Sequence, residues 1–162
     1  MKLGSWIPAQ TSFGSAIASS FYGWEMSLMD EKTQMHGCIE IVDFDKFCLR
    51  QMVRIGLKEI KLICNMLDGT LPIRWRKFFV VRQNYVTDIM YAMAKPFLSK
   101  QFKENIRFIG YDYTELHKMV PLEILPPEYG GTAERREHSL FYKKLSDFEA
   151  KLLAYWKPFK NL

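Results

Sequence analysis

Three short segments of β-branched and aromatic residues, separated by segments with helical periodicity, constrain the fold of this chain most strongly. The strand-like segments cover residues 38–44, 77–81 and 106–110. Between them, apolar side chains recur at helical spacing over residues 47–67, and again from the capping residue Asn84 to about residue 95, before Pro96 ends or kinks the helix. Strands that alternate with helices favour an α/β fold with a mostly parallel sheet and right-handed crossovers.

Further helices are predicted on both sides of this alternating region. We expect helices over residues 13–29 and 113–119, a short basic helix ending at Asn105, and an irregular, proline-rich segment over 121–131. No linker or internal repeat interrupts the 162 residues, so we expect one domain over residues 1–131 and a helical tail over 132–162. The tail is predicted from an apolar stripe at helical spacing, formed by Phe141, Leu145, Phe148, Leu152 and Tyr155.

Composition favours a well-filled interior. Hydrophobic residues make up 48% of the chain, with 12 Phe, eight Tyr, four Trp and nine Met, which are enough to line a cavity or simply to pack a core. No apolar run is long enough to span a membrane, and the first residues contain no signal-like apolar stretch. The three cysteines are odd in number and lack metal-ligand spacing, so we expect a cytoplasmic protein without a metal or cofactor.

The positive charge is concentrated in one part of the chain. The net charge of the whole chain is +5, and residues 74–107, around the most apolar helix, carry an excess of six positive charges. Cationic side chains beside an apolar helix suit an anionic bilayer surface, and a solvated helix face is the alternative interpretation. We expect no nucleic-acid partner, because no recognition-helix or base-stacking motif accompanies these charges.

Catalytic motifs are missing from the sequence. The chain contains no phosphate-binding glycine loop, dinucleotide fingerprint, nucleophile elbow or H-E-x-x-H sequence. His36, His117 and His138 are scattered, and no Cys–His pairing can be inferred from their positions. We therefore expect a protein that is not an enzyme.

Two unusual strings occur in an informative order. K-P-F-L at residues 95–98 closes the apolar helix, and I-L-P-P-E-Y-G-G at residues 124–131 follows the third strand. Together with the W-x-P turn at residues 6–8, Asp43 and the L-D pair at 67–68, this order resembles the CRAL-TRIO domain. The resemblance implies an α/β fold in which an apolar lipid pocket is covered by a mobile gate helix, here residues 85–98.

The chain departs from this family in two places. Met1 falls at the end of the family's first strand, so we expect an N-terminally truncated domain without most of that strand or the preceding helical bundle. Residues 82–84 read R-Q-N, where many relatives have Asn and Pro before the gate helix.

The resemblance also implies residues of the pocket. Those on the gate helix share one face: Ile89, Met90, Met93, Phe97 and Leu98. The opposite wall is expected from the strands and the first helix: Ser20, Trp24, Ile39, Ile41, Phe78 and Val80. Ser20 can offer a hydroxyl to the ligand or simply bond to its own helix. Glu40 lies in a strand that is predicted to be buried, so its carboxylate needs a polar partner or a wetter face.

A headgroup site is implied beside the gate. Arg74 and Arg76 match the first two of four basic residues that bind phosphoinositides in one branch of the family. Gln101 and Asn105 stand at the other two positions, with Lys100 and Lys103 next to them. The implied function is to carry a hydrophobic ligand, such as a tocopherol, retinoid, phosphatidylinositol or sterol-like lipid, between membranes, with transient membrane association. A lipid-sensing or protein-interaction module is the alternative.

Overall fold

The central element of the fold is a three-stranded parallel sheet in the order β1-β2-β3. The computed structural model describes residues 1–134, 143 and 145–150. Its strands are β1 (Cys38–Asp43), β2 (Trp75–Val81) and β3 (Ile106–Gly110). The predicted α/β class is confirmed, and β2 begins two residues before the predicted start. Residues 78–81 of β2 are all buried, as expected for a parallel strand covered on both faces.

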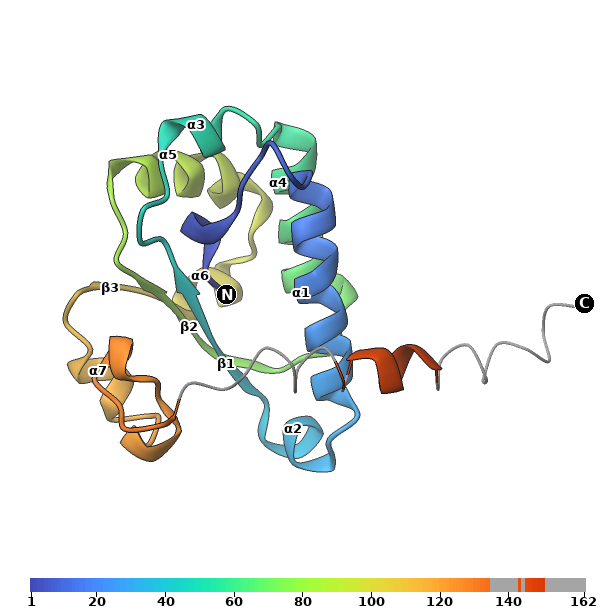
Figure 1. Cartoon of the computed structure of the whole chain (residues 1–162), viewed down its shortest axis with the longest axis vertical. Coiled ribbons are helices and arrows are strands. Elements are labelled where there is room, and N and C mark those ends of the chain that lie inside the picture. The colour runs from blue at the N-terminus through green and yellow to red at the C-terminus, as the bar shows by residue number, and fades with distance from the viewer. Residues whose placement is uncertain (135–142, 144, 151–162) are drawn as a thin grey trace, which may run out of the picture.

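The first residues of the chain run along the outer edge of β1. Lys2 forms a parallel bridge with Asp43. The Met1 amino group donates to the carbonyl oxygen of Ile41 at 2.7 Å, and the Asp43 amide donates to the carbonyl oxygen of Met1 at 2.8 Å. Figure 1 shows this segment between the sheet and α1, where it completes one side of the core.

Six helices precede or connect the strands, and most of them pack on one face of the sheet (Figure 1). Ser12 caps the first helix by accepting a hydrogen bond from the Ser15 amide at 3.1 Å, and Asn84 caps the fifth through the Val86 amide at 2.9 Å. The helices are α1 (Phe13–Leu28), α2 (Glu31–His36), α3 (Leu49–Met52), α4 (Leu57–Asn65), α5 (Tyr85–Ala94) and α6 (Lys100–Asn105).

The prediction of one continuous helix over residues 47–67 was wrong. The segment divides into α3 and α4, and α4 continues into a π-helical turn, η2 (Met66–Thr70). Gly56 occupies the N-cap of α4 in an extended conformation, which separates the two helices. The apolar spacing continues across this break because Met52, Ile55 and Ile60 all point into the same core.

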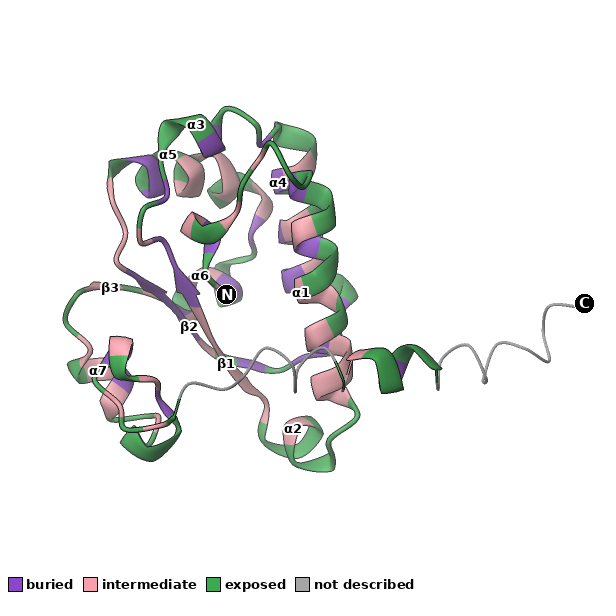
Figure 2. Cartoon of the chain, viewed as in Figure 1, coloured by how far each residue is buried: buried purple, intermediate pink, exposed green. Residues whose placement is uncertain are grey.

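The opposite face of the sheet is covered by a smaller layer. It consists of α7 (Thr114–His117) and two 3₁₀ turns, η4 (Leu122–Ile124) and η5 (Pro127–Tyr129). Their side chains form a second buried cluster with β2, in which Phe79, Val81, Leu116, Leu125 and Tyr129 are buried. Figure 2 shows buried residues concentrated on the strands and on the sheet-facing sides of the helices.

The predicted tail falls largely outside the described residues. Residues 143 and 145–150 are helical, with Leu145 half-buried and Phe148 buried. Phe141, Leu152 and Tyr155 lie outside the described residues, so the amphipathic tail remains a prediction. Among the helices that the structure describes, none combines the length and hydrophobicity needed to cross a bilayer.

Candidate functional site

An apolar cavity lies between the sheet and the helices on its first face. Its volume is about 120 Å³, close to that of a benzene-sized void in a protein core. The strands contribute alternate side chains, which point to the same face, and the helices contribute the other walls. The principal lining residues are Ile17, Val42, Ile60, Cys64, Phe78, Val80, Met90, Tyr91, Ala94, Leu98, Ile106 and Phe108.

Four of the predicted pocket residues line this cavity: Phe78, Val80, Met90 and Leu98. Met93 and Phe97 are half-buried against the same core, and Phe97 also lines an open surface cleft beside Ser99. Ile89 is 45% exposed and points away from the cavity. The face of the gate helix that is buried is therefore rotated about the helix axis relative to the apolar face that the sequence predicted.

Ile39 and Ile41 lie on the other face of the sheet. They pack against the second cluster, with Phe79 and Leu116, so their predicted place in the pocket wall is corrected. Alternation along β1 is real, but it directs Val42 to the cavity and Ile41 away from it. Apolar residues occur on both faces of this strand, and the pattern alone could not select the inner face.

Ser20 and Trp24 also lie outside the cavity wall. The Ser20 hydroxyl lies 3.1 Å from the Met1 sulfur and lines a separate cleft on the surface. Trp24 is buried and packs edge-on against Trp75, with ring centroids 5.7 Å apart. Its indole N–H donates to Glu40 at 3.1 Å, and the Met1 amino group lies 3.3 Å from the same carboxylate. The polar partner that Glu40 requires is thus supplied within the chain.

Lining residues from α1 and α4 were missed by the sequence interpretation. Ile17 reaches the cavity from α1, where Ser20 and Trp24 were expected instead, and Ile60 and Cys64 reach it from α4, where no pocket residue was expected. Ile60 belongs to the apolar stripe of α4, so a search for the inward stripe of each helix would have found it. Burial raises the pKa of the Cys64 thiol to about 11, and the nearby charge of Asp68 adds to this increase.

Polar contacts hold both ends of the gate helix. At its start, the Asn84 side-chain amide donates to the carbonyl oxygen of Phe47 at 2.8 Å. At its end, the α-helix changes at Pro96 into a 3₁₀ turn, η3 (Lys95–Phe97), as the proline predicts. Ser99 follows, and its hydroxyl donates to Asp68 at 2.9 Å while its amide donates to the same carboxylate.

The four predicted headgroup residues lie around β2 and α6. Arg74, Arg76 and Lys100 are exposed, and Lys103 is half-buried. The Asn105 side chain donates to the carbonyl oxygen of Trp75 at 3.2 Å, which brings the end of α6 beside the start of β2. All four side chains are at least partly exposed to solvent, and their joint role as a headgroup site remains a prediction.

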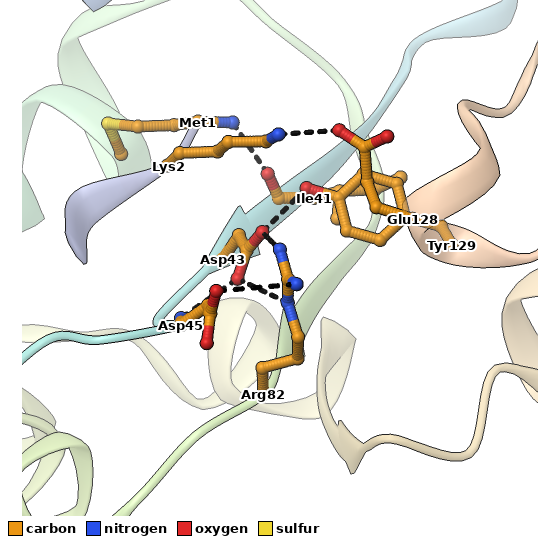
Figure 3. A network of polar contacts seen from close by, with 8 residues as sticks. All are labelled: Met1, Lys2, Ile41, Asp43, Asp45, Arg82, Glu128 and Tyr129. Carbon is orange, nitrogen blue, oxygen red and sulfur yellow. Dashed lines mark hydrogen bonds and ion pairs between the residues drawn. The ribbon is translucent and has the colours of Figure 1, made fainter. Parts of the chain in front are cut away.

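A buried polar network joins the ends of β1 and β2 to the E-Y-G-G segment (Figure 3). Asp43 is 1% exposed and accepts hydrogen bonds from the Arg82 guanidinium, the Tyr129 hydroxyl and the Asp45 amide. Burial of the Asp43 carboxyl opposes its ionisation, but these hydrogen bonds and the Arg82 charge outweigh it and lower its pKa. The network thus fixes the strand ends immediately before α5.

These features define a class of protein: a small α/β domain with an apolar cavity beneath a helix whose two ends are tied to the body. The CRAL/TRIO domain profile matches residues 8–131, and the chain belongs to this family. The predicted family is therefore confirmed, and with it membership of a group of lipid-binding and lipid-transfer proteins.

Curated relatives agree with this assignment. The chain is 30% identical over 128 residues to the human "Alpha-tocopherol transfer protein-like" protein, a match that covers 79% of this chain and 37% of the relative. It is 27% identical to rat "Clavesin-1", with 79% and 36% covered, and 23% identical to rat "Clavesin-2", with 90% and 44% covered. The chain thus spans less than half the length of these relatives.

Proposed function

We propose that the protein is cytoplasmic, binds a hydrophobic, lipid-like molecule in the cavity beneath α5 and carries this molecule between membranes. The observation that supports this most directly is the cavity itself, which is lined by apolar side chains contributed by all three strands and by α5. Moving a methylene group from water into such a site is favourable by about 0.8 kcal/mol, and moving it from water into a bilayer is favourable by a similar amount. The free energy of transferring the ligand between bilayer and cavity is therefore close to zero. The carrier removes the barrier that the ligand would meet in crossing water alone.

The size of the cavity adds a condition to this proposal. Sites for drug-sized ligands usually measure about 300–1,000 Å³. The cavity of about 120 Å³ therefore admits only part of a long lipid. Binding then requires α5 and its neighbours to move outward, which is the role that the family resemblance gives to the gate helix.

A matched pair of substitutions on α5 tests the cavity. Ala94→Leu fills the cavity, whereas Ala92→Leu adds the same atoms to an exposed position on the same helix. We expect the first variant to lose the lipid that co-purifies with the wild-type chain, as measured by mass spectrometry of an organic extract. The second variant is expected to retain it. Equal lipid content in all three folded proteins would contradict the proposed site.

We further propose that Arg74, Arg76, Lys100 and Lys103 dock the protein on anionic bilayers. A Lys or Arg near an anionic surface contributes about 1 kcal/mol, so reversing two charges is expected to weaken vesicle binding by more than tenfold. The test compares Arg74→Glu/Arg76→Glu with the exposed control pair Arg50→Glu/Arg54→Glu in vesicle sedimentation. Including phosphoinositide in half of the vesicles distinguishes a specific headgroup site from general charge attraction. Transfer between vesicles, measured alongside binding, separates a carrier from a lipid sensor.

A further inference from the structure

Along the seam between α5 and β3, the wall of the cavity consists of side chains that also reach the surface. Tyr91 of α5 and Phe108 of β3 both line the cavity, yet Phe108 is 38% exposed and Tyr91 is partly exposed. Their rings pack edge-on with centroids 4.9 Å apart. The aromatic pair therefore has the cavity on one side and solvent on the other.

The position of β3 explains why the seam is thin. β3 is the last strand of the sheet, so Phe108 has the central strand on one side only. Within the strand register, Phe108 lies opposite Val80, whose side chain is 6% exposed and also lines the cavity. Burial thus decreases from the central strand to the edge strand. The Tyr91 ring covers part of the Phe108 ring, and the remainder is exposed.

The other borders of α5 are held by several independent contacts. Val86 is buried in the core on the side of α5 away from Tyr91, and α5 packs against both α3 and α4. Asn84 ties the start of the helix to Phe47, and Ser99 ties the segment beyond its end to Asp68. Lys61 also lies over the Phe97 ring, 6.0 Å from its centroid. At the seam, the edge-on pair of Tyr91 and Phe108 joins α5 to β3.

We propose that the ligand enters and leaves through this seam, with Tyr91 and Phe108 as the pair that closes it. This inference rests on the proposed lipid-carrier function and adds the route and the two residues that control it. Separating the pair requires a sideways movement of α5 away from β3 and leaves the Asp68–Ser99 contact intact. An aromatic pair contributes only modestly beyond its buried area, so such a contact can close and reopen readily.

The outer surface beside the seam suits an encounter with a bilayer. At about 100° per residue, the positions that follow Tyr91 outward around α5 are Lys95 at the C-cap, the exposed Asp88, Ala92, Tyr85 and Ile89. Tyr85 is 64% exposed and Ile89 is 45% exposed. Tyrosine and apolar side chains of this kind favour the membrane interface, and the charged side chain of Lys95 lies at the end of the same helix. The ligand would therefore leave the cavity directly toward the lipid.

Two cross-linked variants distinguish this route from an opening at the end of the gate helix. The native cysteines are first replaced by Cys38→Ser, Cys48→Ser and Cys64→Ala. One variant then carries Tyr91→Cys/Phe108→Cys across the seam, and the control carries Asp68→Cys/Ser99→Cys across the other contact. Each variant is first loaded with fluorescent tocopherol, and its two engineered cysteines are then joined by a short, thiol-specific cross-linker. Release of the fluorescent tocopherol is followed by its quenching in phosphatidylcholine–phosphatidylserine vesicles that contain a quencher.

We expect the seam cross-link to slow release by about tenfold or more and the control cross-link to change it less than about twofold. Slowing by the control cross-link alone, or by both equally, would overturn the proposal, as would an unchanged rate in the seam variant. A parent chain that never retains the probe contradicts the carrier function instead. Without a cross-linker, Phe108→Ala is expected to accelerate release by about tenfold, with Phe97→Ala as the matched control.

Discussion

The Tyr129 hydroxyl donates a 2.8 Å hydrogen bond to the Asp43 carboxylate, which joins residues 86 positions apart in the chain (Figure 3). Asp43 ends β1, whereas Tyr129 belongs to the E-Y-G-G string beyond the last strand. Arg82 binds the same carboxylate and lies over the Tyr129 ring, 5.7 Å from its centroid. The tyrosine of the string is thus a structural residue that fixes the strand ends on the side of the sheet away from the cavity.

Removing this hydroxyl is expected to destabilise the fold. Hydrogen bonds to charged groups contribute about 1.5–3 kcal/mol, so Tyr129→Phe should lower the free energy of unfolding by that amount. Urea denaturation measures the change. Tyr85→Phe is the control, because Tyr85 is 64% exposed, and its effect should remain within about 0.5 kcal/mol. Equal effects of the two substitutions would show that the bond to Asp43 contributes nothing.

Acid should weaken the protein through Asp43. Its pKa is below the ordinary value of 3.8 in the folded chain, so the unfolded chain binds more protons at low pH. The stabilisation is complete above about pH 4 and is lost as the pH falls through the lower folded-state pKa. The free energy of unfolding measured from pH 7 down to pH 3 should show this decrease. In Asp43→Asn the protein should be less stable at pH 7 and should lose less on acidification; an identical pH dependence would exclude Asp43 as the source.

The second glycine of the string has no room for a side chain. A Cβ atom at Gly131 would lie 1.9 Å from the carbonyl oxygen of Leu125, and backbone cannot yield easily. Gly131→Ala should therefore cost about 3 kcal/mol of stability. In contrast, a Cβ at Gly14 in α1 would meet nothing closer than 3.9 Å, so Gly14→Ala should stabilise by about 0.5–1 kcal/mol. Thermal melting of both variants checks the opposite signs.

Cysteine labelling should report movement of the gate helix. Cys64 is 3% exposed and its pKa is raised to about 11, so only about one thiol in a thousand is ionised at pH 8. Cys48 is exposed and should react first with a thiol reagent in the absence of membranes. Anionic vesicles are expected to accelerate labelling of Cys64 and to leave Cys48 unchanged, as followed by peptide mass spectrometry. Acceleration at both sites would indicate general unfolding on the membrane.

The order of elements could be predicted from the sequence because it depends on local patterns. Three β-branched and aromatic strands, the Asn84 cap and the Pro96 boundary all occur where expected. The break between α3 and α4 within residues 47–67 could not be predicted from the local pattern. Apolar residues on both sides of Gly56 face the same core, so their helical spacing continues across the break. The cap position of this glycine becomes clear only when the two helices are packed.

The candidate site was predictable only in part, for a related reason. Phe78, Val80, Met90 and Leu98 line the cavity, as expected from their matching family positions, and their part in ligand binding remains a prediction. Ile39 and Ile41 were placed on the wrong face, since both faces of β1 are covered and carry apolar side chains. Ile17, Ile60 and Cys64 reach the cavity from helices whose inward stripes no family motif marks.

The family, the strand–helix alternation and the charge distribution can be inferred from residue order and composition alone. Which faces meet, and which distant side chains become neighbours, depends on how the elements pack in three dimensions. Tyr91 and Phe108 form the aromatic contact at the seam only because α5 crosses the edge of the sheet. Likewise, Asp43, Arg82 and Tyr129 form one network because three chain segments end at the same place, and hydrophobic periodicity carries no information about such polar convergence.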